Sequence, residues 1–160
     1  MRHVLFIPVA LAIATVAQAQ IDSPPPALQG QASFHLWSVP GVMGIGVLET
    51  FFPCTNTTGA PIRVGIEVFG PAGGAAANDP SATSLNVVAG ATVLFGTNGA
   101  AGLSVDGTLG AGFISKGSAR VLATAKSGII CSAFLADPNN SPPTSMTNLT
   151  VVKKTKQKGD

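Results

Sequence analysis

The chain has 160 residues, of which 46% are hydrophobic and only 10% are charged, and its formal net charge is +2. The last eight residues hold four lysines and one acid, a local net charge of +3, whereas residues 20–152 carry four basic and six acidic side chains, a net −2. This distribution excludes a basic nucleic-acid-binding face on the body of the chain, so we predict no nucleic-acid partner.

Residues 1–19 have the pattern of a cleaved export signal. Arg2 supplies a positive start, Val4 to Val16 form an apolar run, and Ala17-Gln18-Ala19 is a small-x-small cleavage site before Gln20. The apolar run is shorter than the roughly 20 residues that a membrane-spanning helix needs. We therefore predict a secreted or periplasmic protein, cleaved between Ala19 and Gln20, with no transmembrane segment in the mature chain. A buried N-terminal helix is the alternative.

The 141 residues after the signal have the length of one domain. Residues 20–32 contain three consecutive prolines and predict an extended, weakly ordered lead-in. We assign residues 33–152 to a single domain and residues 153–160 to a basic tail. A solubilising role for this tail is preferred over contact with an anionic envelope polymer or a membrane surface.

The first expected strand covers residues 34–38, where apolar and other side chains alternate, and it should end in a turn at Pro40-Gly41. The clearest strand pattern follows between Leu48 and Gly70. It has an alternating inward set, composed of Phe52, Cys54, Ile62, Val64, Ile66 and Val68. Turn-forming residues at 56–61 interrupt it, so we predict one antiparallel hairpin.

The outward set of this predicted hairpin includes Glu49 and Glu67, which we expect to be solvated acids on the strand surface. A carboxylate pair for glycosidase chemistry would need both acids in one cleft, and we favour isolated acids instead. Pro53 has no N–H to donate, so it should face an edge or lie at a bulge.

A surface loop is expected at residues 71–83, followed by further short strands. Their expected ranges are 83–88, 92–96, 103–105, 109–113, 118–125, 129–136 and 148–153. The strands at 83–88 and 92–96 fit either a hairpin or a strand that bends across two sheets. The segment 129–136 is almost continuously apolar, which predicts burial on both faces or a central position.

Seven to nine short strands at intervals of 8–12 residues, with no helical stretch of two turns, predict an all-β, antiparallel β-sandwich. In general architecture this pattern resembles an immunoglobulin-like domain, although the tryptophan position and cysteine spacing of antibody domains are absent. A jelly roll or a partly closed barrel is the alternative.

Cys54 and Cys131 are the two cysteines of the chain, and in an exported protein we expect them to form one disulfide. The alternatives are a free thiol pair and a metal site. One histidine in the mature chain is too few to complete a usual zinc site with two cysteines, so we predict no metal and no cofactor.

Catalytic motifs are also missing from the sequence. The mature chain has one histidine, His35, no tyrosine and no G-x-S-x-G motif, so we predict no catalytic residues and no enzymatic activity. Trp37 fits a sugar-stacking platform less well than a partly buried strand residue. Trp37 and His35 are nevertheless our two candidate ligand contacts.

We therefore predict a secreted, non-enzymatic protein that is a structural or protein-interaction component of the cell envelope or an extracellular layer. Its partners would be copies of itself or other envelope proteins. The alternative is a small-ligand or glycan-binding module that uses loops 71–82 and 97–112 with Trp37. A secreted hydrolase is the least favoured.

Overall fold

The computed structural model describes residues 21, 23–99 and 102–154, which contain strands, turns and loops and no helix. The predicted signal segment 1–19 and residues 155–160 of the predicted tail lie outside the described residues. In the described part of the chain, no helix has the length and apolar character to cross a membrane. The predicted all-β antiparallel fold is confirmed. Its strands are β1 (Phe34–Gly44), β2 (Glu49–Asn56), β3 (Ile62–Phe69), β4 (Leu85–Val87), β5 (Thr92–Gly96), β6 (Gly107–Thr108), β7 (Ile114–Ala123), β8 (Ile129–Cys131), β9 (Phe134–Ala136), β10 (Met146–Asn148) and β11 (Val152–Lys153).

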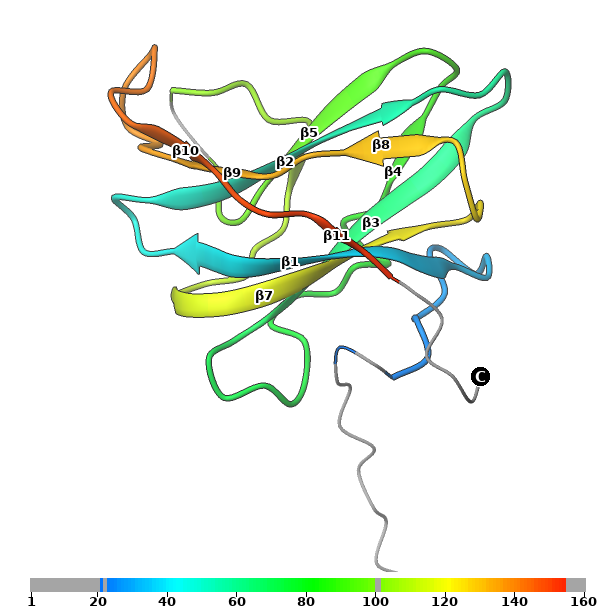
Figure 1. The fold of residues 1–160 in the computed structure, drawn as a ribbon, viewed down its shortest axis with the longest axis horizontal. Coiled ribbons are helices and arrows are strands. Elements are labelled where there is room, and N and C mark those ends of the chain that lie inside the picture. Colours follow the sequence, from blue (N-terminus) through cyan, green and yellow to red (C-terminus); the bar gives the residue numbers. More distant parts are fainter. Residues whose placement is uncertain (1–20, 22, 100–101, 155–160) are drawn as a thin grey trace, which may run out of the picture.

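The strands form two groups. In the first, β11, β1, β7, β3 and β4 pair in that order; in the second, β2 pairs with β5, β8 and β9, and β6 and β10 extend it. Among the described residues, Gly44 opposite Glu49 is the one pair that links β1 to β2. In Figure 1, β1 and β7 run together below β2, β8 and β9. This arrangement is consistent with the predicted β-sandwich. All pairs are antiparallel except β5–β6.

Apolar side chains from both groups pack into one core. The whole predicted inward set is buried there, together with core residues of β1, β4, β5 and β7. These added residues are Val39, Val42, Val87, Phe95, Ala119, Val121 and Ala123. Burial of this apolar surface between the two groups is the main favourable contribution to folding.

The predicted hairpin between Leu48 and Gly70 is wrong. Its two strands exist, but β2 and β3 belong to different groups, and β3 pairs with β7 and β4. Residues 57–61 therefore carry the chain from one group to the other. The buried Asn56 amide supports this crossing by donating to the carbonyl oxygens of Ala60, at 2.8 Å, and Val87, at 2.9 Å. Turn-forming residues predict a change of direction, and they do not specify which strand is the next partner.

The predicted turn at Pro40-Gly41 is also wrong, because β1 continues through it to Gly44. The register with β7 shifts between Pro40 and Val42, which marks a β-bulge. Gly41 has a φ of +81° at this bulge, a conformation that glycine adopts without steric cost.

Three further strand predictions need correction. The segment 129–136 is divided into β8 and β9, and Ile130 is 63% exposed, so burial on both faces is wrong. In the segment 103–113, the structure contains the strand Gly107–Thr108, which falls between the expected strands 103–105 and 109–113. The strands near 83–88 and 92–96 form no hairpin, because β4 pairs with β3 and β5 pairs with β2. The alternative of one strand that bends across two sheets is not seen either, because β4 and β5 are separate strands.

The N-terminal segment covers the outer face of β3 and β7. Leu28 is fully buried and lies over Gly65, where a Cβ atom would come within 2.8 Å of Leu28 Cδ2. Ser33 Oγ donates to the Pro26 carbonyl oxygen at 2.6 Å. The described part of the expected lead-in therefore packs against the sheet through Leu28.

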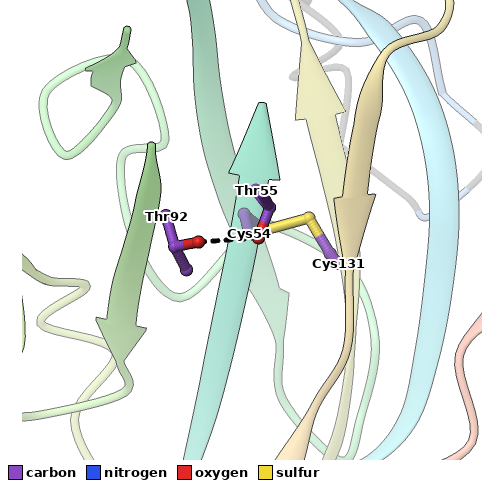
Figure 2. The surroundings of a disulfide bond; sticks show 4 residues. All are labelled: Cys54, Thr55, Thr92 and Cys131. Atoms are coloured by element: carbon purple, nitrogen blue, oxygen red, sulfur yellow. Dashed lines mark hydrogen bonds between the residues drawn. A yellow bond between two sulfur atoms is a disulfide. The ribbon is translucent and has the colours of Figure 1, made fainter. Parts of the chain in front are cut away.

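A disulfide joins Cys54 of β2 to Cys131 of β8. The two residues are directly opposite each other in the β2–β8 pair, with a Cα–Cα distance of 4.2 Å. Figure 2 shows Thr55 beside this disulfide, where its Oγ1 lies 2.8 Å from Thr92 Oγ1 of β5. The second group is thus cross-linked on one side of β2 and hydrogen-bonded on the other.

We expect replacement of both cysteines by serine to lower the free energy of unfolding by about 4 kcal/mol, because the disulfide closes a loop between residues 77 apart. Urea denaturation of the oxidised protein and of the double variant measures this difference. Thiol alkylation before and after reduction is the control. Two reactive thiols in the unreduced protein would contradict the disulfide.

Candidate functional site

The first candidate contact, His35, lies on β1 close to the backbone of the same strand. Its Nε2 atom is 3.1 Å from the Trp37 carbonyl oxygen and 3.0 Å from Ser38 Oγ. A carbonyl oxygen only accepts, so Nε2 carries the hydrogen and donates it. Nδ1 is then the unprotonated atom, and it is buried without a hydrogen-bond partner among the described residues.

This geometry does not suit His35 as a base toward Ser38. A base must accept the hydroxyl proton on an unprotonated nitrogen, and here the nitrogen that faces Ser38 already holds a hydrogen. Burial, together with the positive charges of Arg120 and Lys154, lowers the pKa of His35 to about 4, although the hydrogen bond with the Trp37 backbone opposes this shift. The imidazole is therefore neutral at pH 7.

We expect the NMR titration of His35 in the chain from Gln20 onward, which contains one histidine, to show a midpoint near pH 4 and not near 6.5. Because the folded state binds a proton less readily than the unfolded state, His35 lowers the stability as the pH falls from about 6.5 to about 4. His35→Gln should remove this contribution. A midpoint at 6 or above would contradict the buried position.

A buried ion pair lies on the outer face of the first group. Glu67 of β3 is directly opposite Arg120 of β7, and Arg120 Nε donates to the Glu67 carboxylate. Arg120 is 0% exposed and Glu67 is 3% exposed, so the prediction of a solvated Glu67 is wrong. The reason is that the N-terminal segment covers this face.

The N-terminal segment supplies the remaining partners of Arg120. Nη1 donates to the carbonyl oxygens of Ser23, at 2.6 Å, and Ile21, at 3.2 Å, and Nη2 lies 3.3 Å from Ser23 Oγ. The guanidinium carbon is 5.5 Å from the centre of the Phe69 ring. These contacts give Arg120 a structural position between the sheet and the segment that covers it.

We expect Arg120→Met to lower the free energy of unfolding by about 3–5 kcal/mol, since it leaves the Glu67 carboxylate buried and unpaired. The double variant with Glu67→Leu should recover much of this loss, because neither charge then remains buried. Urea denaturation measures both, with the exposed Lys116→Met as control. A loss below about 1 kcal/mol in Arg120→Met would show that the pair is dispensable.

Glu49, the other expected surface acid, is also buried. It is 4% exposed and accepts a hydrogen bond from the Asn98 backbone N–H at 3.2 Å. Burial raises the pKa of Glu49, and the Asn98 bond opposes this rise. The expectation of a solvated Glu49 is therefore wrong. Glu49 and Glu67 lie in different strand groups, so the fold does not bring them together as a carboxylate pair.

The second candidate contact, Trp37, borders a cleft between the free edges of the two strand groups. The cleft has a volume of about 180 Å³. It is lined by Leu36 and Trp37 of β1, residues 126–129 at the start of β8, and Lys153 of β11. We call it the Trp37 cleft. Trp37 is half-buried, as expected for a partly buried strand residue.

The structure brings together residues that the sequence did not connect. Loops 71–82 and 97–112, which we expected to join Trp37 in a ligand site, contribute none of their described residues to the Trp37 cleft. Lys153, assigned to the tail, belongs to β11 and lies opposite Trp37. In the residues that the structure covers, no three His, Cys, Asp or Glu side chains gather where they could hold a metal ion.

Comparison with known proteins adds no relative. No family model, no curated protein and no solved structure matches this chain.

Proposed function

We propose that this chain is an exported, non-enzymatic protein that associates with copies of itself as a structural component of the cell envelope or an extracellular layer. Export is supported by the signal pattern of residues 1–19 and by the disulfide, which persists in oxidising compartments. Self-association is supported by exposed apolar side chains at one end of the strands.

Three large apolar side chains are exposed at this end. Phe113 is 77% exposed, Val47 is 65% exposed and Met146 is 58% exposed. We call them the end patch. A patch of such side chains typically marks a surface that another protein covers.

A continuous row of paired residues places the end patch on one side of the molecule. The row runs from Met146 through Ala136, Glu49 and Gly44 to Ile114. Val47 belongs to the loop between Gly44 and Glu49, and Phe113 precedes Ile114. Four strand spacings of about 4.8 Å give the row a length of about 19 Å.

A second copy of the chain fits the end patch better than a charged partner. The residues around it, at 45–48, 110–113 and 146–148, carry no charge. Asp137 follows Ala136, the second residue of the row, and Lys116 lies two residues after Ile114 at the far end. In a two-fold contact, the Asp137 side of one copy would meet the Lys116 side of the other, so apolar burial and charge would act together.

We expect light scattering to show a molecular mass that rises with protein concentration, and Phe113→Asp to abolish this rise by placing a charge in the contact. The matched control is Ile130→Asp, because Ile130 is 63% exposed on β8 but lies toward the opposite end of β2. A parent protein that stays monomeric at high concentration would refute the proposal. So would an equal effect of both variants.

A secreted hydrolase remains the least favoured function. The positions of His35, Glu49 and Glu67 supply no base, nucleophile and acid in one cleft among the described residues.

A further inference from the structure

We propose that the Trp37 cleft binds one uronic acid ring of an acidic polysaccharide. This inference goes beyond self-association and uses a different surface, because the cleft lies between β1, β11 and β8 and contains no residue of the end patch. The proposal rests on two lysines that face an apolar cleft of the size of a single ring.

The two lysines that line the cleft come from different segments of the chain. Lys153 of β11 is directly opposite Trp37 of β1, so their side chains project from the same face of the sheet. Lys126 lies in the connection between β7 and β8, and its Nζ atom is 5.0 Å from the centre of the Phe34 ring. This cation–π contact holds an ammonium group beside the cleft.

The positive charge of this region is not neutralised within the described chain. Among residues 21, 23–99 and 102–154, the structure contains one ion pair, Glu67–Arg120, and neither cleft lysine takes part in it. Lys154 adds a further positive charge to this part of the chain, since its backbone N–H donates to the carbonyl oxygen of the cleft residue Leu36 at 2.9 Å. An anionic ligand would therefore be attracted to the cleft.

The size and walls of the cleft favour a single ring with a carboxylate. Its volume of about 180 Å³ corresponds to about six water molecules at about 30 Å³ each, below the range of about 300–1,000 Å³ typical of drug-sized pockets. Leu36 and Trp37, which are both half-buried, offer apolar surface on which the C–H face of a sugar ring can be buried.

A polysaccharide can place one of its rings in the cleft, because Lys126, Ser127 and Lys153 at the cleft are exposed. The neighbouring sugars of a polysaccharide would then lie outside in solvent. A uronic acid holds its carboxylate rigidly next to its apolar face, whereas a glutamate side chain in a peptide would lose rotamer freedom on binding. This difference favours the sugar over an acidic peptide.

Titration with trigalacturonate, followed by the emission of Trp37 and by calorimetry, tests the proposal directly. Trp37 is the one tryptophan of the chain, so its emission reports on this cleft. We expect a saturable change with trigalacturonate that weakens as NaCl is added, and no change with neutral galactotriose. The absence of binding, or equal binding of the neutral sugar, would overturn the proposal.

Matched variants assign the binding to the cleft. Lys126→Gln and Lys153→Gln should each weaken the affinity about twofold to fivefold, as expected for the loss of an exposed ionic contact, whereas Lys116→Gln should leave it unchanged. An equal loss in Lys116→Gln would show non-specific attraction by net charge. Equal affinity for a short oligoglutamate would contradict the choice of a sugar and would indicate an acidic peptide as the ligand. Phe113→Asp should leave sugar binding intact. A failure of the sugar-binding proposal is therefore distinguishable from a failure of the self-association proposal.

Discussion

The guanidinium of Arg120 is the constraint on which the arrangement of the first strand group depends. A fully buried cation must have its charge balanced and its N–H groups bonded, or the fold loses several kcal/mol. Glu67 balances the charge from the neighbouring strand, and the backbone of Ile21 and Ser23 accepts the remaining bonds. The N-terminal segment is thereby required to lie across β3 and β7, where Leu28 fits over Gly65.

Covering segments occupy parts of the outer faces of both strand groups. The outer face of the first group is occupied by the N-terminal segment, and in the second group Val105 packs close to Gly96 and Phe51 is fully buried. Exposed apolar groups, and lysines that form no ion pair in the described part of the chain, lie at the ends and edges of the strands. The end patch lies at one end of the strands, and the Trp37 cleft lies at an edge of the two strand groups.

The sequence predicted the local structure better than the long-range pairing. Alternation between Ile62 and Val68 correctly marks β3 and its inward side chains, because one face of that strand packs in the core. Alternation cannot show whether the other face meets solvent or a covering segment, so Glu67 was expected to be solvated. Likewise, Pro40-Gly41 has the composition of a turn, and a bulge within β1 has the same composition.

For the candidate site, too, the sequence predicted local structure but not contacts between distant segments. Trp37 was correctly expected to be partly buried in a strand, but its neighbours Lys126 and Lys153 come from segments that are distant in the sequence. Their approach to Trp37 depends on the pairing of β11 with β1 and on the position of β8, neither of which has a local signal. An opposite-charge pair such as Glu67 and Arg120 would have been predictable only if the pairing of β3 with β7 had been known.

A thermodynamic cycle tests most directly the role assigned to Arg120. The cycle combines removal of residues 20–26 with the Arg120→Met and Glu67→Leu double variant, and the free energy of unfolding is measured for all four chains. In the parent chain, removal of residues 20–26 should cost at least about 2 kcal/mol more than in the double variant, because it also removes the two carbonyl oxygens that accept hydrogen bonds from the charged Arg120 guanidinium. Equal losses in the two backgrounds would show that the N-terminal segment is held independently of Arg120 and would contradict this role.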